Sequence, residues 1–225
     1  GLASFCSNNK VSYPHHNGEN IMKKLILIAG VIALIGCSKE STPHQTDNEN
    51  MTQPAVAQPA VEKTPEQEGV DKLLAAKSLP EALNLIKPVM SDEVDAFPAS
   101  AGVLAIWMNS KHTTLQDIKA LDSTTKGKIL KDSYNERGKR LCVTGNIVEI
   151  QVDRSGNFPA YHAGIVSNYS DVTRVLAIGS TGDLVEESNA TFCGVVIGKV
   201  SYSNAGGGTT HAPYLVGMFD LPENR

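Results

Sequence analysis

The chain has 225 residues, of which 41% are hydrophobic and 20% charged, and its formal net charge is −4. This length allows one or two domains, and an apolar share close to the globular average excludes a wholly disordered chain. The acidic balance excludes a protein that binds nucleic acid through a generally basic surface. The composition is, however, distributed unevenly along the chain.

The first segment that carries a clear signal begins at Met22. Two lysines follow, then an apolar run over Leu25–Ile35, and then the pair Gly36 and Cys37. A basic start, about a dozen apolar residues and a small residue before the cleavage point are typical of a secretory signal. The run is shorter than the ~20 residues of a membrane-spanning helix. We therefore predict a signal peptide over residues 22–36; the alternative is a buried strand that ends in a free thiol.

The end of this segment, Leu34-Ile35-Gly36-Cys37, resembles the lipobox of bacterial lipoproteins. The resemblance implies that Cys37 is lipidated and becomes the first residue of the mature protein. Ser38 follows in place of an Asp, which by the same resemblance implies a lipid-anchored protein of the Gram-negative outer membrane that faces the periplasm. Residues 1–21 precede this complete signal. We expect that they are not translated in the cell, or that they are a remnant of an expression vector.

Residues 37–65 follow the predicted cleavage point and are rich in Pro, Gln, Thr, Asn and Ser. They include the short repeat Gln53–Val56 and Gln58–Val61, and no face is apolar enough to pack. This composition predicts a disordered or polyproline-like tether with an end-to-end distance of about 30 Å. Residues 1–36 contain three Lys and one Glu, so the chain from Cys37 onward has a formal charge of −6.

Residues 66–136 form a segment with helical spacing of apolar residues. Helices are expected around Val70–Lys77 and over Ala82–Ile86, Ala99–Asn109, Leu115–Leu121 and Ile129–Leu130. Two of them begin with capping-box patterns, Ser78 with Glu81 and Thr114 with Asp117. Trp107 and Met108 lie along the apolar side of the third helix, and we expect them in the core rather than in a ligand site.

From Lys139 the pattern changes to that of β-strands. The predicted strands are Arg140–Ile150, Phe158–Ser167, Thr173–Gly179, Thr191–Ser203 and His211–Asp220. A bulge is expected at Gly145, a short helix or turn over Asp183–Asn189, and a hairpin turn at Ala205–Gly208. Three strands, a short link and a two-stranded hairpin match the OB-fold, a five-stranded Greek-key β-barrel. The expected fold class is α+β, with the short helices packed against an OB-fold barrel over residues 137–225.

The phrase Gly138–Ile150, GKRLCVTGNIVEI, resembles the first strand of the tRNA_anti-like group of OB domains. The resemblance covers residues 134–223. It implies a barrel with a binding role, but it carries over no ligand and no set of functional residues.

The four cysteines are expected to have different roles. Cys6 precedes the predicted start and Cys37 is the predicted lipidation site, which leaves Cys142 and Cys193. These two lie in the first and fourth predicted strands, which are neighbours in such a barrel, and export would place them in an oxidising compartment. We predict a disulfide, worth about 4 kcal/mol from loop-closure entropy; two buried free thiols are the alternative.

No catalytic or metal-binding constellation is visible in the sequence. His162 and His211 are isolated, and Gly179–Gly182 lacks the spacing of a nucleophile elbow. Carboxylates such as Glu149 and Asp153 are not spaced in a way that demands a pair. We therefore expect neither an enzyme, nor a cofactor, nor a bound metal.

A ligand surface is nevertheless expected, because OB barrels usually bind on the face of their second and third strands and with the first and fourth inter-strand loops. Aromatic side chains alternate there with polar ones, a combination that can stack on a sugar, base or peptide. The candidate ligand-binding residues are Phe158, Tyr161, His162, Tyr169, Tyr202, Asn204, His211 and Tyr214. For each residue, ordinary barrel surface or core is the alternative. The barrel segment has seven Lys and Arg against eight Asp and Glu, which argues against a nucleic-acid partner.

The expected function is that of a membrane-anchored periplasmic binding module of OB-fold type, whose partner is an unidentified protein or small envelope ligand. The alternative is an immunity or inhibitor lipoprotein directed against an envelope-acting toxin or hydrolase. Both need only a tethered binding surface. A deep pocket with convergent ionisable groups would instead favour an envelope enzyme.

Overall fold

The computed structural model describes residues 64–168, 170–204 and 206–225, which belong to one structural unit of the chain. The predicted signal peptide, the lipidation site Cys37 and nearly all of the predicted tether lie outside the described residues, and so does Tyr169. Among the helices of the described part, none is long and apolar enough to cross a membrane.

Short helices fill the first half of the described chain. They are α2 (Pro65–Ala75), α3 (Leu79–Ile86), α4 (Ala99–Ser110), α5 (Leu115–Lys119), α6 (Lys126–Lys131) and α7 (Ser133–Glu136). The predicted caps are present: the Ser78 hydroxyl accepts the Glu81 N–H, and Thr114 forms a full capping box with Asp117. The Glu81 carboxylate, however, accepts the N–H of Lys77, so that the box at α3 is not reciprocal. A 3₁₀ turn, η2 (Lys87–Val89), continues α3.

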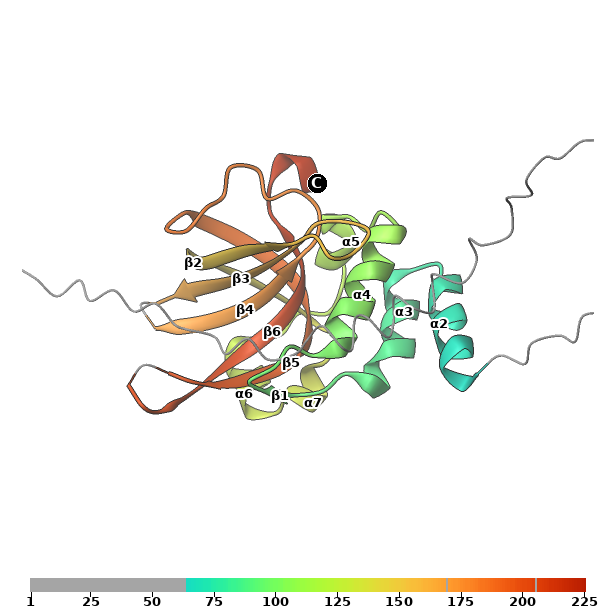
Figure 1. Cartoon of the computed structure of the whole chain (residues 1–225), viewed down its shortest axis with the longest axis horizontal. Helices are drawn as coiled ribbons and strands as arrows, with labels where there is room; N and C mark the ends of the chain where they lie inside the picture. The colour runs from blue at the N-terminus through green and yellow to red at the C-terminus, as the bar shows by residue number, and fades with distance from the viewer. Residues whose placement is uncertain (1–63, 169, 205) are drawn as a thin grey trace, which may run out of the picture. The chain divides into compact units, whose positions relative to one another are not determined.

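One mixed sheet, formed by the second half of the described chain together with a short strand from the first half, closes on itself (Figure 1). Its strands are β1 (Glu93–Val94), β2 (Arg140–Asp153), β3 (Ala160–Ser167), β4 (Asp171–Ala177), β5 (Asn189–Ser203) and β6 (Thr209–Phe219). The order is β1-β5-β2-β3-β4-β6, and β5 also pairs with β6, so β2 to β6 form a ring of hydrogen bonds. The pairs β1–β5 and β4–β6 are parallel, and the others are antiparallel. The fold is therefore α+β with a barrel-like sheet.

The five predicted strands are confirmed, with ends that differ by a few residues, but the predicted bulge at Gly145 is wrong. The bulge lies at Val148, because the register with β3 shifts between Ile147 and Glu149. Gly145 has a different role: a Cβ there would lie 2.2 Å from the carbonyl oxygen of Val166, so only glycine allows this approach of β2 to β3. The short helix or turn expected in the link between β4 and β5 is present as turns, and the two-residue strand β1 was not predicted.

Alternate strand residues enter two separate hydrophobic clusters. The inner cluster lies within the ring and includes Phe192 and Phe219, whose rings meet edge to face with centroids 5.2 Å apart. Ile129 of α6 joins it, so α6 covers one end of the barrel. The outer cluster joins the other side of the strands to α2, α3, α4 and α5 and includes Trp107 and Met108, which confirms both as core residues. In Figure 1, α4 lies against the sheet and α3 and α2 lie beyond it.

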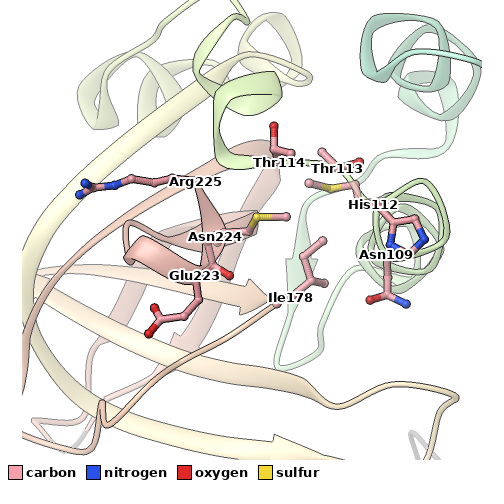
Figure 2. A pocket seen from close by; sticks show the side chains of 11 residues that line it. Asn109, His112, Thr113, Thr114, Ile178, Glu223, Asn224 and Arg225 are labelled. Carbon is pink, nitrogen blue, oxygen red and sulfur yellow. The ribbon is translucent and has the colours of Figure 1, made fainter.

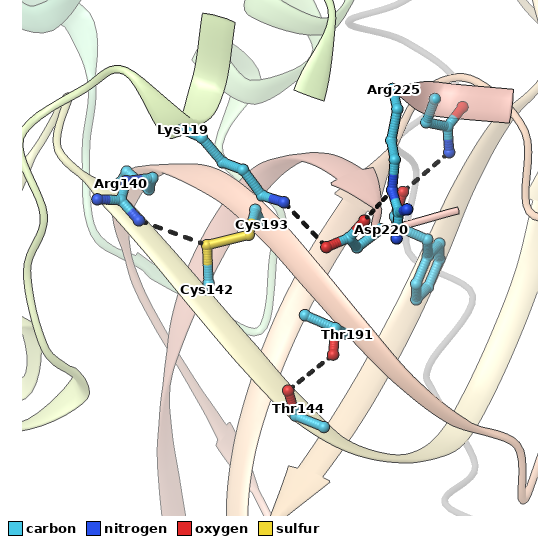
Figure 3. Close-up of polar contacts among 10 residues, drawn as sticks. Lys119, Arg140, Cys142, Thr144, Thr191, Cys193, Asp220 and Arg225 are labelled. Atoms are coloured by element: carbon cyan, nitrogen blue, oxygen red, sulfur yellow. Dashed lines mark hydrogen bonds and ion pairs between the residues drawn. A yellow bond between two sulfur atoms is a disulfide. The ribbon is translucent and has the colours of Figure 1, made fainter. Parts of the chain in front are cut away.

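The predicted disulfide between Cys142 and Cys193 is present and joins β2 to β5 at directly opposed positions. Figure 3 shows it beside a hydrogen bond between the hydroxyls of Thr144 and Thr191, 2.8 Å apart on the same two strands. The disulfide and the hydrogen bond both strengthen the pairing of β2 with β5 in the ring.

The C-terminal end of β6 is also held by charged side chains (Figure 3). Lys119 of α5 and Arg225 each form an ion pair of 2.9 Å with the Asp220 carboxylate. Through Asp220, the helical segment and the last turn of the described chain are tied to the same point of the barrel.

Candidate functional site

Phe97 lies in the segment between β1 and α4 and makes the central contact of an aromatic cluster on the outside of the barrel. Its ring stacks on His162 of β3, with centroids 4.8 Å apart and an interplanar angle of 23°. Its centroid also lies 5.6 Å from that of Tyr214 on β6. Tyr214 is buried, whereas Phe97 is 49% exposed. The half-exposed phenyl ring of Phe97 therefore packs on the aromatic side chains of His162 and Tyr214, which belong to two strands of the barrel.

A buried ion pair accompanies these rings. Arg174 Nη1 lies 2.7 Å from Glu149 Oε2, and the two side chains are 7% and 17% exposed. In the register, Glu149 of β2 and Arg174 of β4 both lie opposite Gly164 of β3. A Cβ at Gly164 would lie 3.0 Å from Arg174 Nη1 and 3.2 Å from the side chain of Val148. Glycine therefore leaves the space through which the ion pair crosses the middle strand.

The pKa directions show which groups around this pair are charged. Burial lowers the pKa of His162, an effect that the nearby Asp153 carboxylate partly offsets, so the imidazole is neutral at pH 7. Burial raises the pKa of Tyr202 and of Tyr214, and Arg174 opposes both shifts. Both phenols therefore keep their protons. The Tyr214 hydroxyl lies 3.5 Å from His162 Nδ1, at the long limit for a hydrogen bond.

Three of the eight predicted ligand residues belong to this region. Tyr214 lies beside Phe97, His162 stacks on Phe97, and Tyr202 lies close enough to Arg174 and Glu149 to interact with both charges. Phe158 packs against the outer cluster. We call the set Phe97, His162, Tyr202 and Tyr214 the aromatic face.

The other predicted residues lie elsewhere or have side chains that stabilise the hairpin. Tyr161 packs against the inner cluster, on the opposite side of β3 from His162. The Asn204 carboxamide oxygen accepts the N–H groups of Gly206 and Gly208 at 3.1 and 3.0 Å. The exposed His211 ring lies 2.7 Å from the Ser201 hydroxyl, across the β5–β6 pair. Tyr169 lies outside the described residues.

Sequence reasoning missed three residues of the site: Phe97, Arg174 and Gly164. Phe97 precedes a helix, far from the strands in sequence, and only tertiary packing brings it to β3 and β6. The available signal for the pair was Arg174, a charged residue directly before the apolar run 175–178. Such a residue must find a partner when it is buried.

Two cavities of about 250 and 260 Å³ lie in the described part of the chain, and no residue of the aromatic face lines either of them. One, of about 250 Å³, lies between the end of α4 and the 3₁₀ turn η3 (Pro222–Asn224), with Met108 and Met218 among its apolar residues. Figure 2 shows Asn109 and His112 on one side and Glu223 and Arg225 on the other. The second cavity, of about 260 Å³, lies beside α3. The aromatic face thus lies outside both of these cavities.

The chain matches no protein-family model, no curated protein and no solved structure. Within residues 64–225 as described, no group of three or more His, Cys, Asp or Glu could hold a metal ion. The chemistry of the aromatic face is stacking and apolar contact by Phe97 and hydrogen bonding by the protonated phenol of the partly exposed Tyr202.

Proposed function

We propose that this protein is a binding module with an OB-type barrel, anchored in the outer membrane through Cys37, that holds a periplasmic partner on its aromatic face. Support for the OB type comes from the strand order. If the five barrel strands are numbered 1 to 5 along the chain, starting from β2, their order around the ring is 1-2-3-5-4. Strands 3 and 5, which are β4 and β6, pair in parallel. A five-stranded Greek-key barrel has this order. The disulfide between Cys142 and Cys193 suits an exported protein.

The observation that carries the proposal is the half-exposed ring of Phe97 on a rigid base. The exposed half of a phenyl ring contributes little to the hydrophobic stabilisation of the fold, whereas aromatic residues, Phe among them, are enriched at the centres of protein interfaces. His162 and Tyr214 hold the ring from below. The side chain therefore loses little conformational freedom when a partner covers it, which favours affinity.

The shape of the surface favours a protein partner over a small enclosed ligand. Small-molecule sites are usually concave and enclose most of the ligand, whereas Phe97 is half-exposed and lines neither of the two cavities described above. Protein interfaces instead combine an aromatic centre with a polar rim. Here the partly exposed Tyr202 supplies a hydroxyl group beside the rings.

The experiment is site-specific photo-cross-linking in cells that produce the full chain. A photoreactive phenylalanine analogue replaces Phe97 in one variant and Val185 in the control; Val185 is 61% exposed in the β4–β5 link and is not part of the aromatic face. We expect a discrete cross-linked protein at position 97 that is missing at position 185. The same products at both positions, or none at position 97, would contradict the proposal.

A further inference from the structure

The disulfide between Cys142 and Cys193 is accessible from one side only. The Cys142 side chain is exposed on β2, whereas Cys193 is 1% exposed and belongs to the outer cluster. Exposed disulfides are the ones that serve as labile, regulatory or catalytic groups. A thiol from solution can therefore reach the sulfur of Cys142 but not that of Cys193.

Arg140 places a positive charge at the accessible sulfur. Its Nη1 lies 3.8 Å from Cys142 Sγ (Figure 3), and its Nε donates a hydrogen bond of 3.2 Å to the carbonyl oxygen of Leu121, which holds the side chain in place. Within the described residues, Arg140 forms no ion pair with a carboxylate. Its charge is therefore available to stabilise a thiolate at Cys142, the form that takes part in exchange.

We propose that this disulfide is an exchange site that oxidises a pair of cysteine thiols in a polypeptide. A substrate thiolate attacks Cys142 Sγ, the bond between the two protein sulfurs breaks, and Cys193 leaves with the electron pair and takes up a proton. The second substrate thiolate then attacks the substrate sulfur of this mixed disulfide, and Cys142 leaves as a thiolate beside Arg140. The other substrate proton passes to water. The substrate gains a disulfide, the protein becomes a dithiol, and two electrons pass from substrate to protein.

The fold keeps the two sulfurs adjacent after the bridge has been reduced. Residues 140–146 of β2 pair in continuous register with 189–195 of β5, and the hydroxyls of Thr144 and Thr191 lie 2.8 Å apart on these strands. Neither contact depends on the bond between the sulfurs. Cys193 therefore stays opposite Cys142 and can resolve a mixed disulfide there.

The backbone at Cys142 favours a polypeptide substrate over a small thiol. Arg140 donates its N–H to Asp122 and accepts the N–H of Thr124, so its backbone groups point away from β5. Cys142, two residues further along the strand, directs its own N–H and C=O to the same edge. β3 pairs with β2 only from Asn146 onward, so none of the described strands occupies the edge at Cys142. An extended peptide can add to this edge and bring its cysteine to the exposed sulfur.

The test follows the reduction of the bridge in the full chain by a synthetic peptide that contains two cysteines. Samples are quenched with acid at intervals, and peptide mapping by mass spectrometry reports the state of Cys142 and Cys193. Arg140→Gln removes the guanidinium and leaves both cysteines in place. Arg154→Gln, at an exposed arginine just after β2, is the matched control.

We expect the folded protein to be reduced, with the peptide attached at Cys142 in the mixed disulfide. Urea below the unfolding transition should leave the rate unchanged, because such urea lowers only the free energy of unfolding. Arg140→Gln should slow the reduction about fivefold, the effect of one charge at about 4 Å in water, and Arg154→Gln should not. The proposal is overturned if reduction accelerates with urea as unfolding does, if the peptide is attached at Cys193, or if the two arginine variants react alike.

A second peptide tests the class of substrate. It has the same two cysteines but carries N-methyl groups at its other residues, so it cannot add to a strand edge, and both rates are divided by those measured with oxidised glutathione. We expect slower reduction by the methylated peptide; equal rates would overturn the assignment of a polypeptide substrate. Because Arg140 and the two cysteines are not part of the aromatic face, this proposal and that of the binding module stand or fall separately.

Discussion

The two sides of the barrel wall use the same strands for different purposes. Inside, Phe192 and Phe219 are fully buried among apolar side chains. Outside, β3 carries His162, on which the half-exposed Phe97 stacks, and β4 carries the buried Arg174. Since alternation along a strand separates the sides, polar and charged groups can be placed outside without harm to the inner cluster. Substitutions inside should therefore destabilise the protein most, and substitution of the half-exposed Phe97 should affect the partner rather than the fold.

The largest effect is expected from Phe192→Ala. Its ring is 0% exposed and meets Phe219 edge to face, so its loss leaves a cavity that the barrel wall cannot fill. Removal of such a ring costs about 3–5 kcal/mol of unfolding free energy. Urea denaturation measures this loss. A cost close to that of Phe97→Ala would show that the inside and the outside of the wall do not differ as described.

Loss of the disulfide should follow in size. The double variant Cys142→Ala, Cys193→Ala removes a bridge between residues 51 positions apart, which should lower the unfolding free energy by about 2–4 kcal/mol. Mass mapping with and without reduction first checks the bridge in the wild type. If reduction of the wild-type disulfide leaves the free energy of unfolding unchanged, the bridge does not stabilise the pairing of β2 with β5.

A moderate effect is expected at Gly164, where the ion pair crosses β3. Gly164→Val places atoms against Arg174 and Val148, and such overpacking costs about 1–3 kcal/mol. Gly156→Val is the control, because a Cβ at Gly156 meets only one atom within 4 Å, at 3.9 Å. Equal stability of the two variants would show that the Glu149–Arg174 pair does not need this space.

The smallest effect is a change with pH that depends on His162. Burial holds its folded pKa below the value of about 6.5 that it has when unfolded. As the pH falls below that value, the unfolded chain takes up a proton that the folded protein resists, so the stability decreases. His162→Asn should flatten the stability profile between neutral and mildly acidic pH. The control is His112→Asn, which replaces an exposed histidine. If His162→Asn leaves the pH profile of stability as it is in the wild type, the burial of the His162 ring is contradicted.

The sequence predicted those features that local patterns determine. Strand alternation located β2 to β6, and capping residues such as Ser78 and Thr114 located helix starts. The predicted disulfide followed from the neighbouring positions of two strands. A single extra residue, Val148, could not be located in this way, because alternation does not reveal where a bulge resets the register.

The candidate site was predictable only in part, for a similar reason. His162 and Tyr214 stand in strands whose face could be inferred, whereas Phe97 reaches them through the packing of α4 on the sheet. Asn204 and His211 were selected for their residue type, but their side chains hydrogen bond within the hairpin. Residue type alone does not show whether a polar group is already paired.

The central claim is that Phe97 serves binding rather than stability. The most direct test measures the affinity of the partner identified by cross-linking for the wild type, Phe97→Ala and Ile106→Ala; Ile106 is a similarly exposed apolar residue of α4. We predict that Phe97→Ala weakens binding at least tenfold, since hot-spot truncations cost about 2 kcal/mol or more. Ile106→Ala should bind as the wild type does, and both variants should remain folded. Equal affinities of the two variants for the partner would contradict the account.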